Sequence, residues 1–185
     1  MAAGADRGSI IALAGRRVDA TDAPQPRFPL GNVPKVRTEL AELFRPGAVR
    51  ALVCSAASGA DLLALDAAGN AGIKRHVVLP FDRATFRSTS VVDRPGDWGP
   101  LFDRIVSEID HQGGLEVGSG DPDDPEVYLR ANERIVSRAL ELANVSPRIS
   151  VVVWEGAPRG TDDVTDDFRR RAEQAGFESR FVLTL

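Results

Sequence analysis

A seven-residue segment, Cys54-Ser55-Ala56-Ala57-Ser58-Gly59-Ala60, contains no side chain larger than a thiol and precedes a helical pattern. Two interpretations fit such a turn: backbone N–H groups at a helix start that bind an anion, or close packing of the helix against a strand. Asp61 follows in the first turn of that helix, where a carboxylate stabilises the helix dipole. The same carboxylate would repel a bound phosphate unless Arg16 or Arg17 lies opposite it.

A second candidate segment is Glu155-Gly156-Ala157-Pro158-Arg159-Gly160-Thr161-Asp162-Asp163. Thr161 is predicted to cap a helix, with Asp162 and Asp163 in its first turn. Capping alone explains these three residues. In a binding site, two adjacent carboxylates would repel a bare phosphate and would suit sugar hydroxyls, a cation or the role of general base, with Arg159 as the compensating charge.

Two polar residues, Tyr128 and Asn132, lie one turn apart on the predicted inward face of a helix that also carries Ile135. Polar groups on an inward face need partners, so these side chains either form hydrogen bonds in the core or reach a pocket. Arg27 and Phe28, in a proline-rich loop, offer a guanidinium and a ring that could stack on a base, unless Phe28 only anchors the loop.

The composition excludes several classes of function. The formal net charge is −4, so the chain has no general attraction to nucleic acid or anionic membranes, and DNA binding is not expected. One cysteine, Cys54, allows no internal disulfide, and with only His76 and His111 beside it a transition-metal site is not expected. The sequence shows no long apolar run and no signal-peptide core, so we expect a cytoplasmic protein without a membrane span, metal or cofactor.

The elements that would position these residues alternate along the chain, with apolar runs predicting strands and 3.6-residue periodicity predicting helices. The predicted strands cover 9–14, 48–54, 75–80, 149–154 and 179–183, and the predicted helices cover 32–45, 59–71, 98–111, 126–143 and 161–175. The segments 81–97 and 113–125 are predicted as irregular connections. Strands that are apolar on both faces form parallel sheets covered by helices on each side. We therefore predict a single three-layer α/β domain over 1–185, Rossmann-like, with a mainly parallel sheet of about five strands.

Ligands of open parallel sheets bind beyond the carboxyl ends of the strands, near a topological switch point. The residues that follow four of the predicted strands should therefore converge on one hollow, whatever the strand order. The predicted ligand-binding residues are Gly15, Arg16, Arg17, Arg27, Ser55, Ser58, Gly59, Asp61, Phe81, Tyr128, Asn132, Trp154, Arg159, Gly160, Thr161 and Asp162.

The order of these motifs resembles the SLOG superfamily, the Rossmann-like group that includes the DNA-processing protein DprA and the cytokinin-activating LONELY GUY enzymes. Ser55 followed by Gly59-Ala60-Asp61 is similar to the Ser…Gly-x-Asp turn of the former, one residue shorter. Val151-Val152-Val153-Trp154-Glu155-Gly156, with Gly160-Thr161 opening a helix, is similar to the strand and helix start of the latter. The ordered set covers nearly the whole chain and most resembles members found beside signalling or defence effectors.

This resemblance implies a pocket for a nucleotide or nucleotide-derived ligand, in a sensor domain that acts through an effector protein or as a homodimer. Some members hydrolyse the N-glycosidic bond of nucleoside 5′-monophosphates, so a phosphoribohydrolase-like N-glycosidase is the alternative. Asp163 or Glu155 would then be catalytic, and Arg16 or Arg159 would hold the phosphate. A non-catalytic interaction domain is the third possibility.

The chain departs from those enzymes at one motif. Their Pro-Gly-Gly-x-Gly-Thr segment and its Glu pair correspond here to Pro158-Arg159-Gly160-Thr161-Asp162-Asp163. Arg159 stands in what is a glycine-rich phosphate loop, and Asp163 is one methylene shorter than the catalytic Glu, which changes the geometry of proton transfer. The sequence therefore favours a sensor over an efficient hydrolase.

Overall fold

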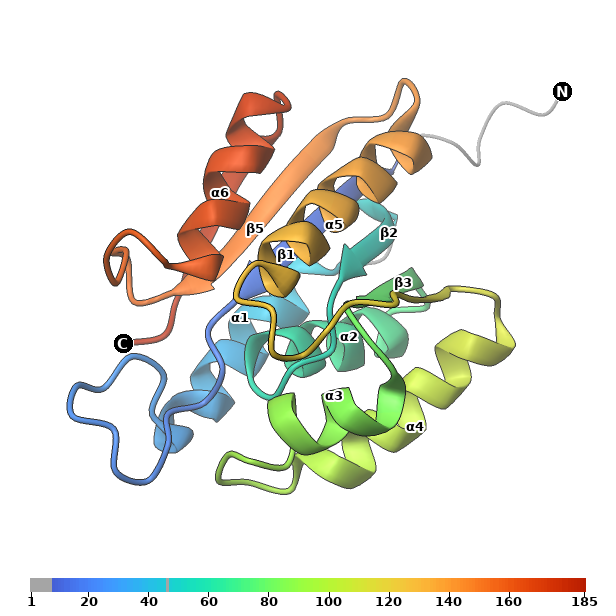
Figure 1. Cartoon of the computed structure of the whole chain (residues 1–185). Helices are drawn as coiled ribbons and strands as arrows, with labels where there is room; N and C mark the ends of the chain where they lie inside the picture. The colour runs from blue at the N-terminus through green and yellow to red at the C-terminus, as the bar shows by residue number, and fades with distance from the viewer. Residues whose placement is uncertain (1–7, 46) are drawn as a thin grey trace, which may run out of the picture.

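Six strands form one parallel sheet in the computed structural model, which describes residues 8–45 and 47–185 (Figure 1). Residues 1–7 and 46 of the predicted domain lie outside the described residues. The strands are β1 (Ser9–Gly15), β2 (Val49–Cys54), β3 (Lys74–Leu79), β4 (Leu115–Val117), β5 (Arg148–Trp154) and β6 (Glu178–Leu183). Their order in the sheet is β4-β3-β2-β1-β5-β6. The predicted α/β class and parallel sheet are confirmed.

Helices cover both faces of the sheet, giving the three layers expected. One face carries α1 (Val33–Leu43), α2 (Ala60–Asn70), α3 (Arg83–Ser90) and α4 (Trp98–His111), with the short 3₁₀ helix η1 (Leu30–Asn32) before α1, and the other face carries α5 (Val127–Ala143) and α6 (Val164–Gln174) (Figure 1). Alternate residues of β1 serve the two layers: Leu13 is buried with the first four helices, and Ala12 is buried with α5 and α6. Strands buried on both faces explain the uninterrupted apolar runs in the sequence.

The chain reverses its progress across the sheet between β1 and β5. From β1 it adds β2, β3 and β4 in turn on one side, and α5 then returns it to place β5 on the other side of β1. At the carboxyl ends of these two neighbours, Gly15 pairs with Val153. The connections that leave β1 and β5 run to opposite faces of the sheet, which opens a crevice at this switch point.

Besides the short η1, one strand and one α-helix of the structure were not predicted. The sixth strand, β4, lies in the segment 113–125 and pairs with Val77–Leu79 of β3, so the expected count of five strands is wrong. Three residues with Glu116 in the middle are too few to produce a recognisable apolar pattern. The segment 81–97 contains α3, whose N-cap Asp82 accepts a hydrogen bond from the backbone N–H of Thr85 at 2.9 Å. The sequence of α3 is mostly polar, so it lacks the apolar periodicity from which a helix is predicted.

The start of α6 also differs from the prediction. The N-cap is Asp163, not Thr161: its Oδ1 accepts hydrogen bonds from the backbone N–H groups of Thr165 at 2.9 Å and Asp166 at 3.3 Å. Aspartate caps a helix at least as well as threonine, and the Thr161 hydroxyl instead donates to Asp162 at 3.2 Å. Asp163 therefore lies at the N-cap position of α6, and not in the first turn of the helix as predicted.

Close approach of α2 to the loop after β1 requires glycine at position 59. Gly59 has φ +94°, and a Cβ there would lie 2.8 Å from both the Arg16 carbonyl oxygen and the Val18 nitrogen. Gly59→Ala is expected to lower the free energy of unfolding by about 2 kcal/mol, through backbone strain and this contact. Gly72→Ala is the matched control, because Gly72 has φ +71° with open space around it and should lose only about 1 kcal/mol. Urea denaturation measures both, and equal losses would contradict the role of the close approach.

Candidate functional site

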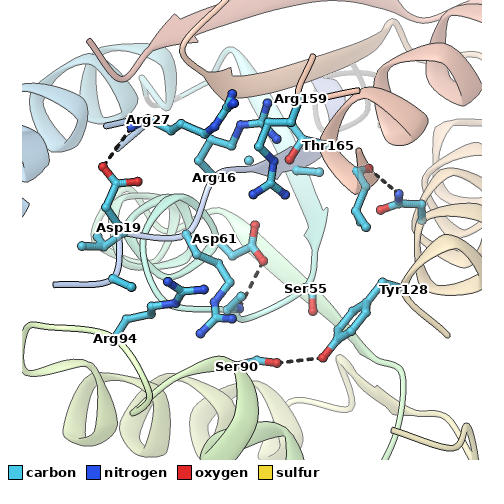
Figure 2. Close-up of a pocket in the computed structure, with 18 of the residues that line it drawn as sticks. Arg16, Asp19, Arg27, Ser55, Asp61, Ser90, Arg94, Tyr128, Arg159 and Thr165 are labelled. Atoms are coloured by element: carbon cyan, nitrogen blue, oxygen red, sulfur yellow. Dashed lines mark hydrogen bonds between the residues drawn. The ribbon is translucent and has the colours of Figure 1, made fainter. Parts of the chain in front are cut away.

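A cavity of about 640 Å³ opens at the switch point, at the carboxyl ends of β1, β2 and β5 (Figure 2). The residues after these strands line it, represented by Arg16, Ser55 and Arg159, together with side chains from α3 and α5. Its volume lies in the range of small-molecule sites. Three of the four strand ends expected to converge therefore meet here directly, and the fourth, that of β3, contributes through α3, which follows it.

Arg16 forms the buried back of the pocket, and all three of its guanidinium nitrogens donate to protein acceptors. Its guanidinium donates to Glu155 Oε2 at 2.6 Å, to Asp163 Oδ1 and Oδ2 at 2.6 and 2.7 Å, and to the Ala157 carbonyl at 3.1 Å. The Arg16 side chain is only 3% exposed. This two-carboxylate clamp ties the end of β1 to the loop between β5 and α6.

The two carboxylates proposed as catalytic groups are held in this clamp. Burial raises the pKa of Asp163, but hydrogen bonds from Arg16 and from the Arg159 backbone N–H outweigh burial and lower the pKa to about 2. Burial likewise raises the pKa of Glu155, and the hydrogen bonds from Arg16 and Arg27 bring it below its usual range. Both groups are therefore ionised, and neither lines the cavity.

Positive charge dominates the wall of the cavity. Among the described residues, five arginines and two aspartates line it: Arg16, Arg17, Arg27, Arg94, Arg159, Asp19 and Asp61. Arg159 has the least compensated charge, since its side chain is 49% exposed and its Nε lies 3.9 Å from Asp163, beyond hydrogen-bonding distance. Burial and then the nearby Arg16 lower the pKa of Arg159, so an anion bound beside it would relieve this repulsion.

A second pair of cations, Arg17 and Arg94, shares one carboxylate. Arg17 forms an ion pair with Asp93 and its Nε donates to the Ser58 hydroxyl at 3.4 Å. Arg94 Nε lies 3.6 Å from the same Asp93 carboxylate. Two positive charges facing one negative charge leave this side of the cavity cationic as well.

Asp61 lies within this cationic surrounding. It is 7% exposed, and its Oδ2 accepts a hydrogen bond from the Ala57 N–H at 3.1 Å. Burial raises the pKa of Asp61 to about 7, against the opposing effects of the Ala57 N–H and the Arg17 charge. The opposing cation that the sequence required is thus Arg17. Figure 2 shows the Asp61 carboxylate facing the cavity, lying in this view between Arg16 and Arg94.

The wall opposite the arginines is aromatic and apolar. The Tyr128 hydroxyl is 3.1 Å from the Ser90 hydroxyl, and the Tyr128 ring packs edge-on against Phe81 with centroids 6.1 Å apart. Phe81 itself is buried behind the wall, where Phe86 faces the cavity in its place. Asn132 also lines the cavity, but its Nδ2 donates to the Val164 carbonyl at 2.8 Å and to Asp167 at 3.0 Å, so its donors are already used.

The loop after β1 closes one side of the cavity. Asp19 Oδ2 accepts hydrogen bonds from the backbone N–H groups of Arg27 at 2.9 Å and Phe28 at 3.0 Å, which folds the loop back on itself. The Phe28 side chain is fully buried, so it anchors the loop in the core and is not available to stack on a base. The loop presents Arg27 at the rim of the cavity (Figure 2).

The structure thus divides the predicted site residues into two groups. Those that line the cavity are Gly15, Arg16, Arg17, Arg27, Ser55, Asp61, Tyr128, Asn132 and Arg159. Those that do not are Ser58, Gly59, Phe81, Trp154, Gly160, Thr161 and Asp162. Gly59 serves close packing, Trp154 stacks on Phe181 at 6.1 Å between centroids, and Gly160 to Asp162 are exposed beyond the rim.

Sequence reasoning missed lining residues that belong to unpredicted elements. Ser90 and Arg94 come from α3 and the turn after it. Asp82, a residue type that caps helices, was the available signal for α3. Thr165 enters the cavity wall because α6 begins at Val164 and not at Thr161.

No family model matches the chain, and no curated protein sequence matches it. Within residues 8–45 and 47–185, no helix is long and apolar enough to cross a membrane. The same residues contain no group of three His, Cys, Asp or Glu side chains placed to hold a metal ion. The cavity and its charges are therefore the basis for an inference about function.

Proposed function

We propose that this cavity binds a nucleotide or a nucleotide-derived phosphorylated small molecule, and that the domain senses this ligand. The observation that carries the proposal is the half-exposed Arg159 guanidinium, poorly neutralised, at the edge of a cavity lined by four further arginines. Guanidinium groups bind phosphate oxygens in a bidentate manner, so this edge suits the anionic part of a ligand.

The rest of the cavity suits the remainder of such a ligand. Phe86 and Tyr128 provide aromatic surface and Ile135 provides apolar surface, against which a base can pack. The position at the switch point of a parallel sheet is where nucleotide ligands commonly bind in this architecture. An open cavity also favours ligand binding over a purely structural interaction domain.

The contacts of the two candidate catalytic carboxylates favour binding over N-glycosidic hydrolysis. A general base must reach the attacking water with an oxygen that is free, and its pKa should lie near the working pH. Asp163 accepts hydrogen bonds from Arg16 and from three backbone N–H groups, and its pKa is about 2. Glu155 is bound by Arg16 and Arg27. These carboxylates hold the arginines in position. A sensor domain requires only this role of them, whereas a hydrolase also requires a free general base.

Titration calorimetry with AMP and ADP-ribose tests the proposal. Arg159→Ala is expected to weaken binding by at least about tenfold, the loss typical of one charge-assisted phosphate contact. Arg37→Ala is the matched control, because the Arg37 side chain is 53% exposed and pairs with Asp66 outside the cavity. Absence of binding by the wild type, or equal losses in both variants, would refute the proposal. Chromatography of the same samples detects free base, whose release would establish the hydrolase alternative.

A further inference from the structure

The cavity proposed to bind an anion also contains a carboxylate, that of Asp61, which an anion does not require. Asp61 is more than nine-tenths buried and lines the cavity, yet its carboxylate repels the phosphate that the surrounding arginines attract. Its Oδ2 is bonded to the Ala57 N–H, whereas its Oδ1 accepts no hydrogen bond from any residue of 8–45 and 47–185. Because Asp61 lines the cavity, this oxygen is open to a hydrogen-bond donor on a bound ligand.

A hydroxyl that lines the same cavity also has no hydrogen-bond partner among the described residues. Ser55 lines the same cavity, and within the described part of the chain its side chain makes no hydrogen bond. Ser55 lies at the start of the small-residue turn and Asp61 lies just after its end. The turn therefore places a hydroxyl and a carboxylate oxygen in the wall of the same cavity. The pair can accept two hydrogen bonds from neighbouring donors on one ligand.

The ligand that satisfies both the arginines and Asp61 has an anionic group and, at a separate point, uncharged hydrogen-bond donors. The vicinal 2′- and 3′-hydroxyls of ribose are such donors, since a carboxylate can accept from both of them. A 2′-deoxyribose lacks one, which would leave part of the buried carboxylate unpaired. Sites that bond a hydroxyl discriminate strongly against the analogue that lacks it, for this reason.

We propose that Asp61, with Ser55, binds the ribose hydroxyls of the ligand and makes the cavity selective for ribonucleotides over 2′-deoxyribonucleotides. This inference rests on the proposed function, because it assigns the sugar part of the same bound nucleotide. Asp61 acts here as a specificity-determining residue, while the arginines supply the affinity for the anion.

The test compares wild type and Asp61→Asn by calorimetry at pH 8 with three probes: AMP, 2′-deoxy-AMP and inorganic phosphate. Wild type is expected to prefer AMP to 2′-deoxy-AMP by at least about tenfold. Asp61→Asn should reduce this preference to about twofold or less and should bind inorganic phosphate severalfold more tightly, because the repelling charge is gone. A smaller preference for AMP together with tighter binding of phosphate in the same variant cannot arise from misfolding, which would weaken the binding of every probe.

Asp66→Asn is the matched control, since Asp66 lies on the same helix and pairs with Arg37 and Arg104 outside the cavity. It should leave all three affinities unchanged. Ser55→Ala, a second variant that removes only a hydroxyl, should lower the preference for AMP without tightening phosphate binding. Equal affinity of wild type for AMP and 2′-deoxy-AMP, or an unchanged preference in Asp61→Asn, would overturn the inference and leave the proposed function standing. Failure of wild type to bind any nucleotide would overturn both.

Discussion

Replacing Arg16 with methionine is expected to lower the free energy of unfolding at pH 7 by roughly 3 to 5 kcal/mol, the loss typical when one partner of a buried ion pair is removed. Arg16 is 3% exposed, and its carboxylate partners Glu155 and Asp163 are 8% and 0% exposed in their side chains. Methionine fills much of the volume but leaves Asp163 buried without its close cation and Glu155 with Arg27 as its remaining partner. Urea denaturation at pH 7 measures the loss.

The control and the pH profile separate this effect from a general effect of losing an arginine. Arg37→Met removes an exposed pair and should cost about 1 kcal/mol or less. The ionised Asp163 stabilises the wild type fully above its ordinary pKa of 3.8, and this contribution is lost as the pH falls towards about 2. The deficit of Arg16→Met should therefore shrink between pH 4 and pH 2. A deficit below 1 kcal/mol at pH 7, or one that does not change with pH, would contradict the role assigned to the clamp.

For the function proposed here, the clamp matters because it positions Arg159 and Arg27. Asp163, held by Arg16, accepts the backbone N–H of Arg159 at 2.7 Å, and Glu155, held by Arg16, pairs with Arg27. Loss of Arg16 should therefore weaken ligand binding, because the groups that it holds in place are displaced. Arg16 is best regarded as a positioning residue that links β1, β5 and α6.

The layers of the fold could be predicted from the sequence, because strands buried on both faces have an unmistakable pattern. The run Ile149–Trp154 has six residues, of which only Ser150 is polar, and it matches β5 closely. Local patterns failed where an element was short or polar: Leu115–Val117 has three residues, and α3 has Phe86 as its single large apolar residue. In such elements tertiary contacts, and not periodicity, decide the structure.

The place of the cavity could be predicted as well, since parallel strands bring all their carboxyl ends to one edge. The role of each charge at that edge could not. Asp163 binds Arg16, which is 147 positions away, and no local signal distinguishes this pairing from a carboxylate that faces a ligand. Asp61 was predicted to need an opposing arginine, and Arg17 is that residue. Such long-range partners decide whether a charged side chain pairs within the protein or remains available to a ligand.

Asp61→Asn is expected to stabilise the ligand-free protein at pH 8 by about 2 to 4 kcal/mol, although it removes a charge that accepts a hydrogen bond. Burial raises the pKa of Asp61 from 3.8 to about 7, so between these values the folded state holds a proton that the unfolded state has lost. Stability therefore falls as the pH rises from about 4 to 7 and then levels off, and a shift of this size corresponds to about 4 kcal/mol. The asparagine oxygen can still accept from the Ala57 N–H, so most of this penalty should be relieved.

The comparison of wild type and variant at two pH values isolates this group from all others that titrate. Asp61→Asn should unfold at a higher urea concentration than wild type at pH 8, and this difference should be much smaller at pH 4.5. Asp66→Asn should not be stabilised at pH 8, because it removes the ion pairs of Asp66 with Arg37 and Arg104 outside the cavity. A variant less stable than wild type at pH 8 would mean that Asp61 is retained for the structure of the turn. Stabilisation at pH 8 would mean that a buried carboxylate is kept against the stability of the fold, which is expected of a residue that serves a ligand.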